Sequence, residues 1–175
     1  MYRLGIYSEL ILKFQGIMMI EQGQTLPTAS LTELTSEGMQ THSTESLFAG
    51  KKVVLFAVPG AFTPTCSNAH LPEFVALADK IMAKGVDAIY CVSVNDAFVM
   101  KAWGEAHNAE HIRMLADGDA SFTKALGLDK DTASFGGIRS TRYAMIVENQ
   151  TVAGLFVEQD KEFAVSRAEA ILEKL

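Results

Sequence analysis

Residues 53–67 read VVLFAVPGAFTPTCS, and the arrangement of the whole chain can be worked out from this stretch. Its first part, Val53–Val58, is continuously apolar, which is typical of a strand buried on both faces of a sheet. Two prolines and a glycine then break the strand and predict a rigid turn. The turn delivers Cys66 to the expected start of a helix. The pattern therefore predicts a strand, a turn and a helix, with a thiol at the junction.

This junction is suited to holding Cys66 as a thiolate, because free N–H groups at a helix start and neighbouring cations both favour the ionised form of a cysteine. The candidate cations are Arg139 and Arg142, which lie in a segment that enters a later strand. Their positions leave open whether either reaches the sulfur or is simply solvated. Thr63 lies three residues before Cys66, and its hydroxyl can both donate and accept a hydrogen bond. The expected pocket combines a thiolate, a hydroxyl, backbone donors and a guanidinium.

The composition bounds the class of protein. The chain has 175 residues, of which 49% are hydrophobic, and this suits one globular domain with its own core. The net charge of −6 argues against nucleic acid or an anionic membrane as the main partner. No run of about 18 apolar residues occurs, so we expect no transmembrane helix.

The two cysteines, Cys66 and Cys91, are too few for a disulfide framework, and neither belongs to a C-x-x-C pair. No cysteine cluster offers a zinc site, so we expect no bound metal. A reducing compartment is the natural setting for such a chain, and we expect a cytoplasmic protein.

Residues 1–19 are expected to be an N-terminal extension, and residues 20–175 to form the folded domain. Charged and polar residues interrupt the apolar positions of the extension, and no small-residue cleavage site follows, so it does not match a secretory signal. A misplaced start, with Met18 or Met19 as the working initiator, is the preferred interpretation. A weakly amphipathic helix that docks elsewhere on the protein is the alternative.

Strand-like and helix-like segments alternate along the domain. A hairpin is predicted over residues 29–42, followed by a helical turn capped by Ser43 or Thr44. Pro72 is expected to kink the helix after Cys66 or to tighten its first turn. The pattern predicts a three-layer α/β domain whose ligand chemistry lies where the parallel strands end. The other predicted elements are strands at 53–58, 86–94, 112–115, 143–147 and 151–157, helices at 67–84, 97–109, 120–126 and 166–175, and a loop at 129–140.

Residues 59–66, PGAFTPTC, resemble the P-x-x-x-T-x-x-C active-site motif of the peroxiredoxins. Supporting stretches resemble the type II branch of that family, which is also called type V, and they are residues 91–99, Trp103, residues 115–118 and residues 139–143. The resemblance runs from about residue 22 to the end of the chain. It implies a thioredoxin-like fold with a central mixed sheet and an N-terminal hairpin. It also implies a homodimer that reduces hydrogen peroxide and organic hydroperoxides with the help of a thiol.

The motif positions imply a role for each site residue. Cys66 would be the peroxidatic cysteine, which becomes a sulfenic acid, and Thr63 would hydrogen-bond the peroxide. Pro59 would shield the sulfur, and Arg142 would hold both the thiolate and the peroxide oxygens. Arg139 is retained as a supporting residue. The resemblance implies no prosthetic cofactor.

The sulfenic acid must be reduced by another thiol, and Cys91 is the one internal candidate. It lies inside an apolar predicted strand, so we expect a structural cysteine, with a Cys66–Cys91 disulfide as the alternative. Family members with a late resolving cysteine would place it near the final hairpin, but residues 151–160 contain none. We therefore expect a one-cysteine cycle in which glutathione and glutaredoxin, or thioredoxin, supply the electrons.

Other side chains leave alternatives open. His70 lies four residues after Cys66 and is expected to be a structural or supporting histidine, with a catalytic Cys–His pair as the alternative. His107 is expected at the surface. Phe62 and Phe98 are expected in the core, with a dimer contact as the alternative. A competing function is a peroxide sensor or redox-regulated chaperone, and the missing C-x-x-C disfavours a general disulfide oxidoreductase.

Overall fold

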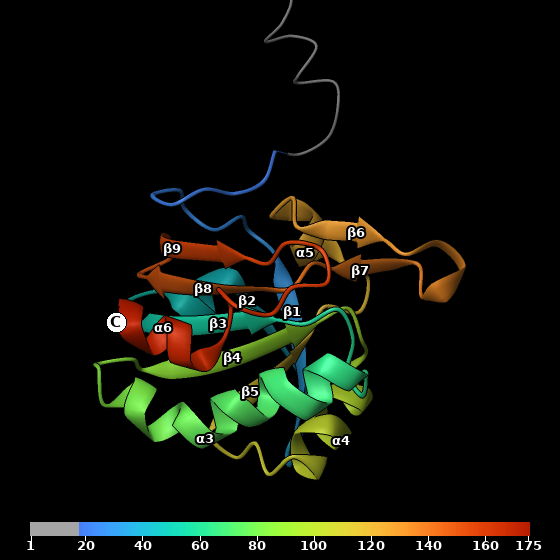
Figure 1. Cartoon of the computed structure of the whole chain (residues 1–175), viewed down its shortest axis with the longest axis horizontal. Coiled ribbons are helices and arrows are strands. Elements are labelled where there is room, and N and C mark those ends of the chain that lie inside the picture. The colour runs from blue at the N-terminus through green and yellow to red at the C-terminus, as the bar shows by residue number, and fades with distance from the viewer. Residues whose placement is uncertain (1–17) are drawn as a thin grey trace, which may run out of the picture.

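The structure, a computed structural model, describes residues 18–175, so most of the predicted N-terminal extension lies outside the described residues. One mixed sheet forms the centre of the molecule (Figure 1). Strands β3, β4 and β5 are parallel, and every other pairing in this sheet is antiparallel. The strand order is β2 (Gly38–Ser43), β1 (Ser30–Thr35), β5 (Ile112–Ala116), β4 (Ala88–Ser93), β3 (Lys52–Ala57), β8 (Tyr143–Glu148), β9 (Thr151–Val157).

The sheet is covered on both faces, as the apolar run in β3 predicts. Alternate residues of this strand enter two separate core clusters, with Val54 and Phe56 on one face and Val53 and Leu55 on the other. The first face packs against α3 (Leu71–Met82), α4 (Ala97–Ala106) and α6 (Ala168–Lys174), and the second against α2 (Thr44–Phe48) and α5 (Ser121–Ala125). These layers confirm the thioredoxin-like α/β fold with its central mixed sheet and N-terminal hairpin.

The capped helix starts are also present. The Ser43 hydroxyl accepts a hydrogen bond from Ser46 N–H at the start of α2, and the Asp96 carboxylate accepts one from Val99 N–H at the start of α4. Such side chains satisfy N–H groups that a helix leaves without an internal partner. Within residues 18–175, no helix is both long and apolar enough to cross a membrane.

The prediction of a loop over residues 129–140 is wrong. Two short strands, β6 (Asp129–Asp131) and β7 (Ile138–Ser140), form a separate hairpin around a short 3-10 helix at Ala133–Phe135. Figure 1 shows this hairpin standing beside the main sheet. All three residues of β6 are exposed, so its side chains carry no apolar periodicity that would indicate a strand.

The active-site turn is the segment at residues 59–65. The helix that follows it is distorted near Pro72, but the first turn of this helix is wider, not tighter, than a regular α-helical turn. Residues Cys66–His70 form a π-helical turn that leads into α3, and Leu71 N–H donates to Cys66 O. Pro72 has no N–H for the carbonyl of Asn68, so the regular hydrogen bond cannot form there. A five-residue spacing replaces it, and the expectation of a tight first turn is therefore wrong.

Candidate active site

Cys66 lies where the sequence places it, just beyond the end of β3 and in the first turns of the helix that leads into α3. Its side chain is buried, with only 1% of the residue exposed. The sulfur nevertheless has two polar neighbours. Thr63 Oγ1 lies 3.0 Å from Sγ, and Arg142 Nη2 donates to Sγ over 3.1 Å. A thiolate at this position has a hydroxyl and a guanidinium as donors.

The turn that carries these groups is fixed by hydrogen bonds from neighbouring elements. Thr63 Oγ1 lies 2.6 Å from Gly60 O, inside the turn. The Ala61 N–H donates to Asn95 Oδ1 over 3.0 Å, which ties the turn to the end of β4. Phe62 has a left-handed backbone, with φ of 62°, a conformation that costs a residue with a side chain energy. Strain of this kind indicates that the surrounding contacts hold the turn in one shape.

Arg142 is held in place by His70. Arg142 Nη1 donates to His70 Nδ1 over 2.8 Å, because a guanidinium has no acceptor. The proton of His70 is therefore on Nε2, which donates to Ser166 O over 3.0 Å. Burial, followed by the positive charge of Arg142, lowers the pKa of His70 to about 3. A neutral histidine that orients the guanidinium is what this geometry describes, in place of a base that acts directly on Cys66.

Arg139 lies beside the turn and does not hydrogen-bond the sulfur. Its Nη1 donates to Pro59 O over 3.3 Å, and its Nε donates to Gly136 O over 3.2 Å. A Cβ at Gly60 would lie 2.8 Å from Nη1, and one at Gly136 would lie 2.6 Å from Nε. The two glycines therefore leave the space that this guanidinium occupies, between the active-site turn and the β6–β7 hairpin.

Cys91 has a different environment from Cys66. It lies in β4 opposite Phe56 of β3 and is fully buried in the same core cluster as Cys66. Burial raises the pKa of the Cys91 thiol well above its ordinary value. Both cysteines are free thiols. Cys91 in this position is a small core side chain and a poor nucleophile.

Helix α4 supports the active-site helix through residues whose part in the site the sequence did not reveal. The Trp103 indole N–H donates to Ser67 Oγ over 3.0 Å, and His107 Nε2 lies 3.0 Å from Ser67 O. Trp103 is buried, whereas His107, which is expected at the surface, is half-buried. The four-residue spacing of Trp103 and His107 on a helix was the available signal, because it places both on one face.

The expected core positions of two phenylalanines are wrong. Phe62 is 56% exposed and Phe98 is 64% exposed. Phe62 lies in the active-site turn and Phe98 in the first turn of α4, and the Ala61–Asn95 hydrogen bond joins these two segments. Large apolar side chains are usually buried, so apolar character alone cannot distinguish a core position from an uncovered surface.

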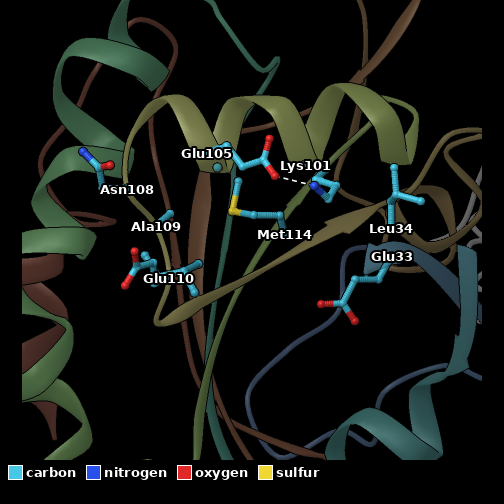
Figure 2. A pocket seen from close by; sticks show the side chains of 10 residues that line it. Glu33, Leu34, Lys101, Glu105, Asn108, Ala109, Glu110 and Met114 are labelled. Atoms are coloured by element: carbon cyan, nitrogen blue, oxygen red, sulfur yellow. Dashed lines mark hydrogen bonds and ion pairs between the residues drawn. The ribbon is translucent and has the colours of Figure 1, made fainter. Parts of the chain in front are cut away.

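Two hollows open on the surface. The larger, of about 800 Å³, lies beside the active-site turn, and its lining includes Pro59, Thr65, Arg139 and Arg142. The smaller, of about 420 Å³, lies between α4, β5 and β1, where Lys101 and Glu105 form an ion pair along α4 (Figure 2). The smaller hollow contains no predicted site residue. Among residues 18–175, no group of three or more potential ligands is arranged to hold a metal ion.

Comparisons with known proteins identify the family of the chain. The model of the Redoxin family matches residues 21–172. The chain is similar to Peroxiredoxin-2C of Oryza sativa subsp. japonica, with 50% identity over 156 residues that cover 87% of this chain and 96% of that protein. It is also similar to Peroxiredoxin-2D of Arabidopsis thaliana, with 46% identity over 159 residues that cover 89% and 98% of the two chains. Reduced Prx3 from Vibrio vulnificus, solved in complex with hydrogen peroxide, has 70% identity and a TM-score of 0.88, with 89% and 99% covered.

Proposed function

The chain belongs to the Redoxin family and is a peroxiredoxin, a thiol-dependent peroxidase, and from this premise we propose that Cys66 is the residue that peroxide oxidises. The observation that carries the proposal is the pair of donors, Thr63 and Arg142, that meet at a buried sulfur. A buried thiol without such donors is expected to stay protonated and inert. The hydrogen peroxide bound to the similar Prx3 of Vibrio vulnificus supports peroxide as the substrate class.

The reaction begins when the Cys66 thiolate attacks one oxygen of the peroxide in line with the O–O bond. The S–O bond forms as the O–O bond breaks, and the second oxygen leaves as hydroxide or alkoxide. Sulfur loses two electrons and becomes a sulfenic acid, the first and reversible stage of cysteine oxidation. Charge therefore moves from the sulfur to the leaving oxygen, and groups that donate hydrogen bonds along this path stabilise the transition state.

Arg142 and Thr63 are assigned to that stabilisation. The guanidinium has five N–H groups and uses one on His70 and one on the sulfur, so others remain for a peroxide oxygen. The Thr63 hydroxyl lies beside the sulfur and can accept a hydrogen bond from the peroxide O–H. Pro59 lies at the rim of the pocket, and it has no N–H to compete for the peroxide. Arg139 supports the same turn through Pro59 O.

The sulfenic acid is assigned to a one-cysteine cycle in which an external thiol restores Cys66. The first thiol forms a mixed disulfide with Cys66 and releases water, and a second thiol reduces that disulfide. The burial of Cys91 inside β4 supports this assignment. Cys91 would have to be ionised to attack Cys66, and burial raises the pKa of the Cys91 thiol. Glutathione with glutaredoxin, or thioredoxin, is the proposed source of electrons, and a reducing cytoplasm is the proposed location.

The role of Cys66 is tested by steady-state consumption of hydrogen peroxide with a thiol donor. Cys66→Ser is expected to lose turnover, because a hydroxyl at this site is not an ionised nucleophile. Cys91→Ser is the matched control and is expected to turn over. Full activity of Cys66→Ser would contradict the assignment. Oxidation of Cys66 without catalytic turnover in the wild type would favour a sensor in its place.

The one-cysteine cycle is tested by the intact mass of the protein after one equivalent of peroxide. A sulfenic acid trapped on Cys66 by a specific reagent is the expected product. A loss of two mass units, with Cys66 and Cys91 recovered in one linked peptide, would instead identify a disulfide and contradict the cycle. The same experiment on Cys91→Ser provides the reference mass.

A homodimer is also proposed, with the exposed Phe62 and Phe98 in the contact. The two side chains come from segments joined by the Ala61–Asn95 hydrogen bond, so they belong to one region of the surface. Aromatic side chains are enriched at protein interfaces, and exposed apolar groups mark candidate contact surfaces.

A further inference from the structure

The groove beside the active-site turn is much larger than hydrogen peroxide requires. Its volume is about 800 Å³. Sites that bind organic ligands have volumes of ~300–1,000 Å³, so this groove lies within their range. One water molecule takes up about 30 Å³, and hydrogen peroxide has only one more oxygen atom. Hydrogen peroxide alone would therefore leave most of the groove empty. The groove is therefore sized for the organic part of a larger reactant.

The groove leads to the residues around Cys66. Arg142 lines the groove and also donates to the Cys66 sulfur, so one guanidinium separates an occupant of the groove from the reacting atom. One wall is the β6–β7 hairpin and the other is the segment at residues 158–162. A Lys130–Asp160 ion pair of 2.6 Å links the two walls. Both partners are exposed, and a pair of this kind is weak enough to separate when a ligand enters.

Arg139 places in this groove a guanidinium that forms no ion pair with residues 18–175. It lines the groove, and the two backbone carbonyls described above fix its guanidinium. Those bonds use two of its five N–H groups, and no partner for the other three is found among residues 18–175. No carboxylate of that part of the chain lies within ion-pair distance of it. A fixed guanidinium with free N–H groups matches the geometry of a carboxylate.

None of the acidic residues of the groove forms an ion pair with Arg139, although one oxygen of Glu158 is buried without a hydrogen-bond partner. Asp160 is paired with Lys130. Glu158 points one carboxylate oxygen at the N–H groups of Ala164 and Ser166, each within 2.8 Å. Glu162, the remaining acid, is exposed, and so is its neighbour Lys161.

We propose that the groove binds the organic substituent of a hydroperoxide, and that Arg139 binds a carboxylate on that substituent. The inference rests on the proposed peroxidase role of Cys66. The thiolate forms a bond to the terminal oxygen of ROOH, the O–O bond breaks, and RO⁻ leaves and takes a proton from water to become ROH. Cys66 becomes the sulfenic acid. The carboxylate takes no part in the bond changes, so Arg139 determines specificity and is not a catalytic residue.

The hydroperoxide is favoured over the reducing thiol as the occupant. Cys66 as a residue is 1% exposed and its sulfur faces two donors, which is an arrangement for attack on a small peroxide group that enters the pocket. The chain of the hydroperoxide would then lie in the adjoining groove. A thiol reductant reacts only after the sulfur has gained an oxygen.

The test compares a medium-chain hydroperoxy fatty acid with its methyl ester, and measures Cys66 oxidation by rapid quenching and intact mass. The ratio of the two rate constants, acid over ester, cancels any general damage to the turn. For Arg139→Gln this ratio is expected to fall by about tenfold, since the charged hydrogen bonds are lost. Arg139→Lys should retain part of the ratio. Lys101→Gln, which removes a positive charge in the other hollow, should leave it unchanged.

Three results would overturn the inference. The first is an unchanged acid-over-ester ratio in Arg139→Gln, and the second is an equal fall of this ratio in Lys101→Gln. The third is an effect of Arg139→Gln that is confined to the later reduction by glutathione, which would assign the anion site to the reductant. If Arg139→Gln does not fold, hexanoate must slow oxidation of the wild type by the acid and not by hydrogen peroxide, and a lack of this competition contradicts the inference. Failure of the wild type to react with any hydroperoxide would instead contradict the proposed function.

Discussion

The Thr63 hydroxyl has one proton and two neighbouring acceptors, Gly60 O at 2.6 Å and Cys66 Sγ at 3.0 Å. When the sulfur is protonated, the hydroxyl can donate to Gly60 O and accept from the thiol. When the sulfur is ionised, the hydroxyl can turn and donate to it, while Gly60 O keeps the Thr63 N–H at 3.4 Å. One rotation of one hydroxyl therefore accommodates both states without movement of the turn.

Replacement of this hydroxyl is expected to slow the attack on peroxide. Thr63→Val keeps the shape of the side chain and removes the donor, so the second-order rate constant with hydrogen peroxide should fall by about 10²–10³-fold. Thr63→Ser retains a hydroxyl and should lose much less. The rate constants are measured by stopped flow or by competition with a second peroxidase. A Thr63→Val rate within twofold of the wild type would exclude this role.

His70 should make the stability of the protein depend on pH. Its pKa is about 3 in the folded chain against an ordinary value of 6.5, because it is buried and faces Arg142. Between pH 6.5 and pH 3, His70 therefore binds a proton in the unfolded chain but stays neutral in the folded chain. Stability is fully present above pH 6.5 and decreases as the pH falls towards 3, with a loss of about 2 kcal/mol at pH 5.

Urea unfolding at pH 7.5 and pH 5.0 measures this loss. His70→Gln cannot titrate, so its stability should change less between the two pH values than that of the wild type. Glu33 does not confound the comparison. Its pKa is lowered from 4.5, against the effect of burial, by hydrogen bonds and charges from Arg113 and His42, so its contribution is lost only below pH 4.5. An equal loss in both proteins would contradict the buried neutral histidine.

Among the secondary-structure elements, a short connecting turn and a longer helix both fix the positions of the site residues. The π-helical turn Cys66–His70 brings Cys66 and His70 to the same side, where Arg142 contacts both. Helix α4 holds the next residue, Ser67, through Trp103 and His107. The segment that carries Cys66 is thus held by the π-helical turn itself, by Arg142 and by the contacts from α4.

Gly127 is a sensitive point between elements. Its φ is +69°, and a Cβ there would lie 2.8 Å from backbone atoms of Met18 and Met19. Gly127→Ala combines backbone strain with a clash, so the free energy of unfolding should fall by about 2–4 kcal/mol. Gly50 is the control, since its φ is +68° but no atom lies within 4 Å of its Cβ position.

Gly50→Ala should therefore show the strain alone, about 1 kcal/mol. Denaturant unfolding of both variants measures the difference, which reports the contact between the N-terminal segment and the end of α5. Equal losses in the two variants would mean that this segment yields without cost.

At the scale of the whole molecule, the dimer proposal predicts a mass of about twice 19.0 kDa in solution. Phe98→Asp places a charge in the proposed contact and should shift the protein towards the monomer. Met39→Asp is the control, because Met39 is 47% exposed on the edge strand β2, outside the proposed contact. Sedimentation velocity measures both variants. A wild-type monomer, or an unchanged dimer in Phe98→Asp, would contradict the contact.

Local sequence patterns are sufficient to predict the elements that are buried on both faces or capped by recognisable side chains. Strand β3, helix α2 with its Ser43 cap and the position of Cys66 beyond a strand end all followed from local patterns. Burial and capping act on neighbours in the chain, so they leave a periodic signal. The β6–β7 hairpin left none, because its strands are held by backbone hydrogen bonds and β6 is exposed.

The tertiary structure was needed to show which arginine donates a hydrogen bond to the Cys66 sulfur. Strand β8 runs antiparallel to β3 with Tyr143 opposite Ala57, so Arg142 emerges where the active-site turn begins. Arg139, three residues earlier, meets the carbonyls of Pro59 and Gly136 instead. It was likewise the tertiary structure that left Phe62 and Phe98 uncovered. These outcomes depend on strand register and on contacts between residues far apart in the chain, which no local pattern encodes.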